Sequence, residues 1–446
     1  MATNISQAAV ATPRMDEGSI RKIALTALAG TSIEWYDFFL YGTAAALIFP
    51  RAFFAADMPP AVALLASFST FAVGFVARPV GGIIFGHYGD RIGRKRALVV
   101  ALLLMGTATT LIGCLPSYAA IGAWAPILLI ALRFAQGIAI GGQWGGAVLL
   151  ATENAPPAKR GFYGSFAQVG APVGVILANL AFLIVSANTS PEAFLEWGWR
   201  VPFLASVVLI GIALFIQLRL EETVEFLRLQ KAGGRTTAAS TSRPASRSPV
   251  IEALRTHPKQ IALAAGAFLA VQVPFYILIA FVIAYGTGAA GPGVSRDTML
   301  SAVLVGAVAM IPALLISAAW SDRHGRRSIY ITGAALLAAW SFAIFPLVDS
   351  GSFVLICVAI AVGQVLVAMM YGPQAAFLTE LFSTSVRYSG ASLGYQLGAI
   401  IGGGFAPIIA TALLAKYQST VGISIYMAIA CIITIISTAL LSERKA

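Results

Sequence analysis

The chain has 446 residues, of which 59% are hydrophobic and only 11% are charged. Soluble domains have about a quarter of their residues charged, so this composition excludes an ordinary soluble protein and indicates an integral membrane protein with many spans. The formal net charge of +11 does not indicate a nucleic-acid partner, because the positions of the positive residues along the chain explain it.

Apolar runs long enough to cross a bilayer as helices, about 20 residues each, occur along the whole chain. They predict twelve spans, at residues 23–49, 61–85, 97–115, 124–152, 161–186, 200–219, 260–286, 298–320, 329–348, 352–378, 388–415 and 420–441. The longest polar segment, Glu221 to Lys259, separates the sixth span from the seventh, and its Ser, Thr, Arg and Pro content is typical of a flexible linker. We therefore expect an all-α membrane protein with an N-terminal tail (1–22), two six-helix halves (23–219 and 260–441), a linker (220–259) and a C-terminal tail (442–446).

The 29 Lys and Arg residues are distributed unequally between the two sides of the predicted membrane. Two lie inside spans, and 23 lie on the side that holds both termini. The four on the opposite side are Arg51, Arg200, Arg296 and Lys416. Because positive residues are retained on the cytoplasmic side, both termini and the linker are predicted to be cytoplasmic. The first 20 residues lack an apolar core, so no cleaved signal peptide is expected.

Two acidic residues, Glu34 and Asp37, lie in the middle of the first predicted span. Each carboxylate at that depth costs about 2.5–3.5 kcal/mol on insertion scales, so we expect both to face a protein-lined cavity. Residues three apart share one face of a helix, and two close carboxylates cannot both ionise cheaply. One of them would then hold a proton, as a proton carrier requires. The alternative is a structural ion pair with an arginine of another span.

Arg133 and Arg78 are the positive residues inside the predicted spans. Arg133 is expected at the depth of the two acids, either as their counter-ion or as the anchor of a substrate carboxylate, because a guanidinium binds carboxylates through two parallel hydrogen bonds. A permanent structural pair is the alternative. Arg78 lies eight residues before Gly86, roughly 12 Å from the cytoplasmic end. We assign it a structural role, either extending toward the membrane surface or joining the cytoplasmic gate.

Neutral polar residues recur inside the predicted spans of both halves. Any one of them also fits helix packing, but as a set they predict a central substrate site. Pro274 and Pro373 predict helix breaks beside some of them, which favours a cavity. The candidate binding residues are Tyr41, Gln136, Gln143, Trp144, Gln168 and Asn179 in the first half, and Gln272, Tyr276, Gln364, Tyr371, Gln374, Tyr395 and Gln396 in the second.

The two halves repeat in sequence. Asp90-Arg91-Ile92-Gly93-Arg94-Lys95 follows the second span, and Asp322-Arg323-His324-Gly325-Arg326-Arg327 follows the eighth. The spacing of Glu153 and Arg160 after the fourth span recurs as Glu380 and Arg387 after the tenth. With an even number of helices per half, this repeat predicts two halves related by an axis along the membrane normal.

The repeated motifs are predicted to lie in the short loops between neighbouring helices. Gly93 and Gly325 are expected to make tight turns in these loops. Asp90 and Asp322 are expected to cap a helix N-terminus, where a carboxylate is favoured by about 0.3–1 kcal/mol.

These motifs and this topology resemble the major facilitator superfamily over nearly the full length of the chain. Within it, the chain is similar to the metabolite:proton symporters, whose members carry shikimate, α-ketoglutarate, citrate, proline or betaine. Glu is common in that family where Gln143 stands, so Gln143 is expected to change the specificity if that Glu carries charge. The stretches that carry the closer resemblance are Glu34-Trp35-Tyr36-Asp37-Phe38, Tyr41-Gly42, Ala77-Arg78-Pro79, Gly141-Gly142-Gln143-Trp144-Gly145-Gly146 and Trp197-Gly198-Trp199-Arg200.

The resemblance implies that the aspartate of a repeated motif meets the other half and latches the cytoplasmic gate while the substrate site faces outward. It thereby implies a set of gating residues around the two motifs. These are Gly86, Asp90, Arg91, Gly93, Arg94, Glu153, Arg160, Asp322, Arg323, Gly325, Arg326, Glu380 and Arg387.

The sequence thus predicts a monomeric, proton-coupled symporter of the cytoplasmic (inner) membrane that imports a small organic acid or zwitterion by alternating access. A proton-coupled exporter or antiporter is the second possibility, because Gly170-Ala171-Pro172-Val173-Gly174 faintly resembles a motif of drug antiporters. A non-transporting receptor or scaffold is the third. No nucleotide loop, His pair or nucleophile triad occurs, and the three cysteines lie in apolar spans, so no enzymatic activity, cofactor or metal is expected.

Overall fold

The computed structural model describes residues 17–92, 94–141, 156, 159–219, 255–382 and 387–441. Within this part the first half is built of long helices joined by short turns or helical segments. The long helices are α1 (Glu17–Leu47), α3 (Pro60–Ile92), α4 (Arg94–Cys114), α6 (Trp124–Gly141), α8 (Arg160–Ala187) and α10 (Arg200–Arg219). The short segments are α2 (Phe49–Ala52), α5 (Tyr118–Ile121), α9 (Pro191–Ala193) and the π-helix η2 (Phe194–Gly198).

The second half repeats this plan, with π-helical segments inside two of its helices. The uninterrupted helices are α15 (Arg296–His324), α16 (Arg326–Asp349), α17 (Phe353–Glu380) and α20 (Val421–Leu440). The interrupted ones are α13 (Pro258–Tyr276), η3 (Ile277–Phe281) and α14 (Val282–Thr287), and then α18 (Arg387–Gly398), η4 (Ala399–Gly404) and α19 (Ala406–Tyr417). Among the described residues, each of the twelve predicted spans thus contains a helix or an interrupted helix, the fourth as far as Gly141, so the all-α architecture is confirmed.

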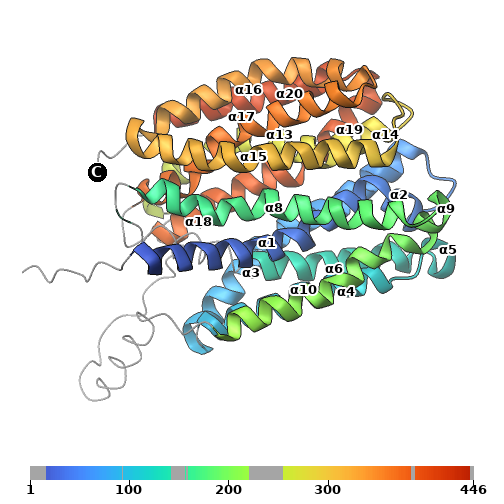
Figure 1. Cartoon of the computed structure of the whole chain (residues 1–446), viewed down its shortest axis with the longest axis horizontal. Helices are drawn as coiled ribbons and strands as arrows, with labels where there is room; N and C mark the ends of the chain where they lie inside the picture. The colour runs from blue at the N-terminus through green and yellow to red at the C-terminus, as the bar shows by residue number, and fades with distance from the viewer. Residues whose placement is uncertain are drawn as a thin grey trace, which may run out of the picture.

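Nine helices of the described residues are long and apolar enough to cross a bilayer, and α9, η2 and α10 together make a tenth, bent by 49°. The remaining predicted spans correspond to α1, which carries Glu34 and Asp37, and to α4, whose apolar part Val99–Cys114 is shorter. Figure 1 shows the helices side by side along the long axis, with the first half (blue to green) below the second (yellow to red).

Two predicted details of the helices are wrong. The second repeated motif is not a loop, because Asp322 and Arg323 belong to α15, which ends at His324, and only Gly325 separates it from α16. An apolar run marks where the lipid ends, whereas a helix continues into water as long as its hydrogen bonds and its final positive residues stabilise it. Pro373 lies inside the uninterrupted α17, whereas Pro274 is followed by η3 as predicted. Proline is tolerated within a membrane helix when neighbouring groups satisfy the freed carbonyl.

The halves meet along two helix pairs that are equivalent under the repeat. In one, α8 of the first half packs against α15 and α17; in the other, α3 packs against η4 and α19. The repeat relates α3 to α15, and it relates Arg160 and Arg387, the first residues of α8 and α18. The same contact is therefore made twice, as expected for halves related by an axis along the membrane normal.

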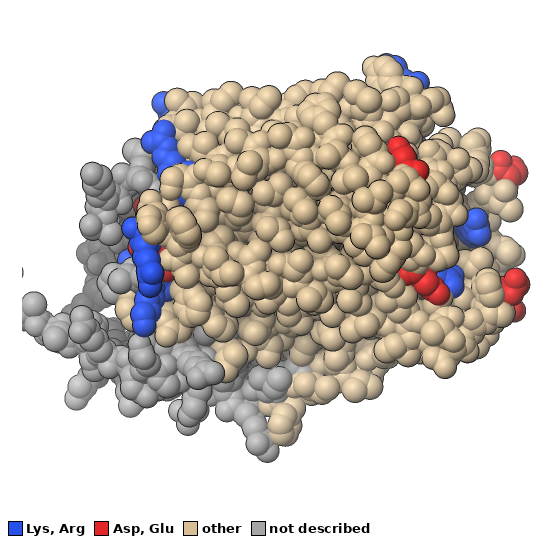
Figure 2. All heavy atoms as spheres, turned by 45° about the horizontal axis from the view of Figure 1, so that its top comes forward, with Lys and Arg blue, Asp and Glu red and all other residues tan. Residues whose placement is uncertain are grey.

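The charged residues gather at the ends of the molecule. Figure 2 shows a broad face without charged atoms, with Lys and Arg concentrated at one end and Asp and Glu with fewer positive residues at the other. Large apolar side chains such as Ile184, Val208 and Ile316 are exposed on its outer surface, as suits contact with lipid. We call the end where α8 begins and α15 ends the Asp322 end, and the opposite one the Arg296 end.

Candidate functional site

Asp37 of α1 is buried inside the first half, with only 2% of its surface exposed. The Ser206 hydroxyl of α10 donates a hydrogen bond to Asp37 Oδ1 (2.7 Å), and Thr109 of α4 lies beside the same carboxylate. Gln136 Nε2 of α6 donates to Thr109 Oγ1 (2.7 Å), and Arg133 Nη1 donates to Gln136 Oε1 (3.0 Å). Asp37 and Arg133 are therefore connected through neutral side chains from two helices.

The expected ion pair between Arg133 and the acids is not formed among the described residues. The Arg133 guanidinium lies over the rings of Phe38 (4.3 Å), Tyr41 (4.2 Å) and Phe71 (4.8 Å). Arg133 Nε approaches the Phe71 carbonyl (3.5 Å), and Arg133 Nη2 has no hydrogen-bond partner. The prediction judged depth along the helices correctly but had no information on the aromatic side chains that surround the arginine.

Glu34 and Asp37 do not share an environment, although they lie three residues apart on α1. Glu34 is partly exposed, and its charge acts on Tyr395 of α18 in the second half. Asp37 instead faces α10 and α4 within its own half. The spacing predicts that the two acids share one face of α1, but they face different halves, because α1 packs between its own half and the other one.

A central cavity lies where the halves meet. The cavity is small, with a volume of about 10 Å³, and it is bordered on one side by Trp35 of α1 and Ala171 of α8. The second half supplies the rest of the lining: Val271, Gln272, Phe275, Tyr276, Val367, Tyr371 and Tyr395. Four of the predicted binding residues, Gln272, Tyr276, Tyr371 and Tyr395, are therefore brought together here.

Other predicted binding residues are buried but do not line this cavity. Within the first half, the Tyr41 hydroxyl donates to Thr70 Oγ1 (2.6 Å), and Asn179 Oδ1 accepts from the Thr43 hydroxyl (3.3 Å). Some buried amides have side-chain atoms without a hydrogen-bond partner among the described residues; these are Gln168, Gln364, Gln374 and Gln396. Gln143 and Trp144 lie outside the described residues.

Arg78 of α3 is buried deeper than predicted and does not extend to the membrane surface. It is 1% exposed, and its Nε, Nη1 and Nη2 atoms have no hydrogen-bond partner among the described residues. Its guanidinium lies over the rings of Phe75 (4.3 Å), Phe38 (4.6 Å) and Trp35 (5.7 Å). Such contacts stabilise a cation by about 0.5–2 kcal/mol, whereas each unmade buried hydrogen bond costs about 1–3 kcal/mol and more for a charged group.

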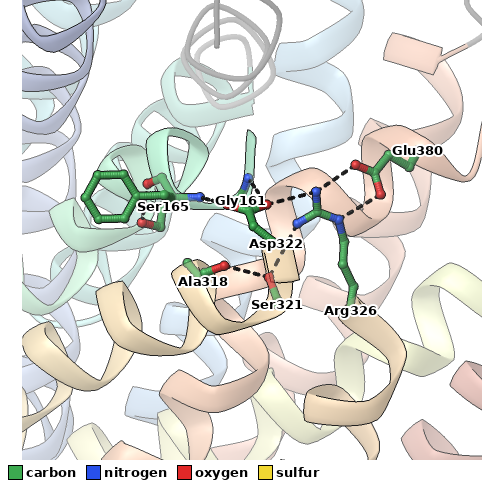
Figure 3. A network of polar contacts seen from close by, with 8 residues as sticks. Gly161, Ser165, Ala318, Ser321, Asp322, Arg326 and Glu380 are labelled. Atoms are coloured by element: carbon green, nitrogen blue, oxygen red, sulfur yellow. Dashed lines mark hydrogen bonds and ion pairs between the residues drawn. The ribbon is translucent and has the colours of Figure 1, made fainter. Parts of the chain in front are cut away.

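The Asp322 end holds a cluster of charges that joins the halves (Figure 3). The backbone N–H groups of Gly161 and Phe162, at the start of α8, donate to the two carboxylate oxygens of Asp322 (2.8 and 2.9 Å). The Arg326 guanidinium contacts Asp322 (3.2 Å) and forms two parallel hydrogen bonds with Glu380 of α17 (2.7 and 2.8 Å). The predicted capping by Asp322 is confirmed, and it is the N-terminus of a helix in the other half that it caps.

Two glycines make this cluster possible. Gly325 has φ +88°, a conformation that glycine adopts most readily, and forms the predicted tight turn between α15 and α16. A Cβ at Gly161 would lie 2.7 Å from both Asp322 Oδ1 and Arg326 Nη1. Only a residue without a side chain therefore lets the first turn of α8 approach the carboxylate this closely.

The remaining predicted gating residues are described only in part. Arg160 is the first residue of α8, with a buried Nε that has no hydrogen-bond partner among the described residues, and Arg323 is exposed in the last turn of α15. Gly86, Asp90 and Arg91 belong to α3, Arg94 begins α4 and Arg387 begins α18, but their surroundings lie outside the described part. Gly93 and Glu153 lie outside it altogether.

The Arg296 end holds a second connection between the halves, which the sequence analysis missed. The Ser186 hydroxyl, at the end of α8, donates to Asp297 Oδ1 (2.7 Å) and accepts from Arg296 Nη2 (2.6 Å) at the start of α15. The Arg296 guanidinium also lies 3.7 Å from the ring centre of Phe194 in η2. The paired charges of Arg296 and Asp297 were a visible signal, but nothing in the sequence related them to Ser186. Together with the Asp322 cluster, this contact joins α8 and α15 at both ends.

The arrangement offers no metal chemistry in the described part of the chain, where no three His, Cys, Asp or Glu side chains gather. The described part of the site consists of one buried carboxylate, two buried guanidinium groups, and a neutral cavity wall with three phenols and one amide. Such groups can hold a proton or bind a small molecule through hydrogen bonds.

Comparison with known proteins identifies relatives over nearly the whole chain. Residues 22–445 match the family model described as "Sugar (and other) transporter". The shikimate transporter of Escherichia coli K12 is 42% identical, over 97% of this chain and 98% of that one. The proline/betaine transporter of Salmonella typhimurium LT2 is 31% identical, over 95% of this chain and 83% of that one.

Solved structures agree on the fold. The E. coli xylose transporter, in a partially occluded inward-open conformation, superposes with a TM-score of 0.74 at 18% identity, over 96% of this chain and 99% of that one. A D-xylose–proton symporter superposes with a TM-score of 0.75 at 18% identity, over the same shares. These similarities and the twelve-helix architecture place this chain in the sugar (and other) transporter family of the major facilitator fold, as a multi-pass membrane transporter and not an enzyme.

Proposed function

We propose that the protein is a proton-coupled symporter that imports a small organic acid or zwitterion. The observation that carries this proposal is Asp37, a carboxylate buried in a membrane-spanning helix and connected to Arg133 through Thr109 and Gln136. A carboxylate so placed is costly to keep charged, so taking up a proton from the outside and releasing it inside changes the energy of the carrier. No cofactor is required, because the proton gradient supplies the energy.

The relatives favour a carboxylate-bearing substrate. Two of them are named as transporters of shikimate and of proline and betaine, which all carry one carboxylate. A cavity wall of three phenols and an amide suits the neutral body of such a molecule, because hydroxyl and amide groups donate and accept hydrogen bonds without adding charge. A cyclic, hydroxylated monocarboxylate is the substrate class with the strongest support.

The two contacts between α8 and α15 suit alternating access. We assign the Asp322 end to the cytoplasm, because 23 of the 29 Lys and Arg residues belong to the side of the termini. Opening toward the cytoplasm then requires the Asp322 cluster to separate, and opening outward requires the Ser186 contacts to separate. Glu34, at the interface, and Asp37, inside the first half, are the candidate proton carriers, with Arg133 balancing the charge.

Uptake into proteoliposomes tests this function directly. Labelled shikimate, proline and betaine are supplied outside, with or without an inside-alkaline gradient. We expect accumulation of at least one of them above equilibrium, only when the gradient is imposed. Accumulation in inside-acidic vesicles alone would instead identify an exporter, and equilibration without any gradient dependence would contradict proton coupling.

A further inference from the structure

Two arginines are buried at the centre of the molecule, and they differ in how their donors are satisfied. Arg133 donates to Gln136 and approaches the Phe71 carbonyl, so that only Nη2 remains without a partner. Arg78 has no hydrogen-bond partner on any of its three nitrogens among the described residues, although it is 1% exposed. Arg133 is therefore integrated into its own half, whereas Arg78 has no partner at full hydrogen-bond distance and has the hydroxyl groups of Tyr276 and Tyr395 as its polar neighbours.

The aromatic neighbours of Arg78 hold the guanidinium without using its hydrogen-bond donors. Phe75, Phe38 and Trp35 provide ring faces within 4.3–5.7 Å of the guanidinium carbon. The rings contact the flat face of the guanidinium, whereas its N–H groups lie in the guanidinium plane and point outward from its edge. Two parallel N–H groups on one edge match the two oxygens of a carboxylate. Arg78 is thereby prepared for an anion.

Arg78 lies beside the central cavity, next to residues that line it, although it is not itself a lining residue. Trp35, which the guanidinium contacts, is one of the lining residues. The charge of Arg78 also acts on the hydroxyl groups of Tyr276 and Tyr395, which line the cavity from the second half. An anion bound by Arg78 would therefore lie between the halves, with two phenol hydroxyls within reach.

We propose that Arg78 binds the carboxylate of the transported molecule and that Tyr276 and Tyr395 donate hydrogen bonds to it. This inference rests on the proposed function and extends it by naming the anchor, which is the residue that binds the substrate carboxylate. It assigns to the site a monocarboxylate with a neutral body that packs on Trp35 and hydrogen-bonds to Gln272 and Tyr371. Arg133, which is already bonded within the first half, serves the proton carrier instead.

The anchor is tested by comparing the binding of each carboxylate with that of its methyl ester, which lacks the anionic oxygens. The purified full-length protein is heated with shikimate, benzoate or proline, each compared with its methyl ester, and the shift in Tm is measured. A ligand that binds only the folded state raises Tm, and at equal concentration the ligand with the lower Kd raises it more. In the wild type we expect at least one carboxylate to raise Tm far more than its ester.

Arg78→Gln should abolish this preference, lowering the affinity for the carboxylate by at least about tenfold and leaving the ester unchanged. The matched control is Arg200→Gln, which should leave binding unaltered, because the Arg200 guanidinium donates hydrogen bonds to the carbonyls of Gly113 and Leu115. Without ligand, Arg78→Gln should have an equal or higher Tm than the wild type, because it removes a buried charge without partners.

An Arg78→Gln protein that still prefers the carboxylate overturns the anchor, as does a wild type that binds none of the three carboxylates. If Arg78→Gln does not fold, Arg78→Lys decides, because it keeps the charge and loses the two parallel bonds. An unaltered preference in Arg78→Lys, or failure of both variants to fold, contradicts the proposal.

Gradient-driven uptake by the wild type decides the proposed function separately. Wild-type binding through Arg78 without proton-driven accumulation would contradict symport and keep the anchor. Proton-driven accumulation by the wild type, combined with an unchanged preference in Arg78→Gln, would keep symport and remove the anchor.

Discussion

The two halves of the molecule share one architecture but bury different kinds of polar group. The first half has Asp37, Arg78 and Arg133 at its centre, each at most 2% exposed. The second half, within its described residues, has its charged side chains at the two ends of its helices, as in the Asp322 cluster and the Arg296 contact. Its centre is neutral and consists of phenols and amides.

This difference indicates that the two halves have different roles in transport. Binding a proton or an anion changes the charge of the first half only, whereas the second half offers hydrogen bonds whose strength depends little on charge. The charged clusters of Asp322 and Arg296 at the ends of the second half form contacts with α8. These contacts have to break when the halves move. Five substitutions test the comparison, and they are ordered from the largest expected effect to the smallest.

Asp37→Asn should abolish accumulation of substrate against its gradient, because an amide cannot carry the proton. Exchange of labelled for unlabelled substrate should persist, since exchange requires reorientation without net proton movement. The measurement is uptake and exchange in proteoliposomes, with the exposed Asp57→Asn as the matched control. If both Asp37→Asn and Glu34→Gln accumulate substrate at the wild-type level, the coupling site is not on α1 and the comparison fails.

Asp322→Asn should favour states that are open at the Asp322 end. Hydrogen bonds to a charged acceptor contribute about 1.5–3 kcal/mol each, and losing the charge should shift the equilibrium by about tenfold. The readout is labelling of a cysteine introduced at Ala171, in a cysteine-free background, by an impermeant maleimide applied from either side.

Gly161→Ala should reproduce the shift produced by Asp322→Asn, because its Cβ would lie 2.7 Å from the same carboxylate oxygen. If the maleimide labels the cysteine at position 171 equally in both variants and in the wild type, the Asp322 cluster does not control which end is open.

Gln272→Leu should weaken substrate binding without altering the coupling. Losing one neutral hydrogen bond of about 0.5–1.5 kcal/mol should raise KM by about 3–10-fold. The number of protons moved per substrate, measured from the reversal potential, should remain that of the wild type. A changed proton stoichiometry would show that the neutral wall takes part in coupling, against the proposed difference in roles.

Ser186→Ala should have the smallest effect. Its hydroxyl bonds to Asp297 and Arg296, but Asp297 is half exposed, with 51% of its side-chain surface accessible, and exposed charges contribute little. We expect a shift of about two- to threefold toward states open at the Arg296 end, measured by the same maleimide labelling. A shift as large as that of Asp322→Asn would make the two ends equivalent.

Much of the architecture was predictable because it depends on local properties. The apolar runs located all twelve helices, and the ends of α8, of α10 and of the interrupted helix from Pro258 to Thr287 lie within two residues of the predicted ones. The repeated motif with Asp322 was correctly expected to cap a helix, since a carboxylate beside free N–H groups is favoured wherever they meet. Gly325 was correctly expected at the turn, because the chain there adopts a positive φ.

The sequence predicted many residues of the site but not the contacts between them. The sequence analysis named Asp37, Arg133 and the four polar cavity residues, but it paired Arg133 with the acids and did not anticipate the aromatic rings around Arg78. Ser206 and Thr109, which surround Asp37, did not stand out, because hydroxyl residues are common in membrane helices and usually bond to their own backbone.

The sequence by itself therefore determined the twelve helices and their repeat, because hydrophobic length and the order of residues act along one helix at a time. Only the tertiary structure decided that Glu34 faces the second half while Asp37 faces α10, and that Arg78 lies beside the cavity among aromatic rings. Which face of a helix meets which neighbour depends on how each helix is rotated. That rotation is set by the packing of all twelve helices together.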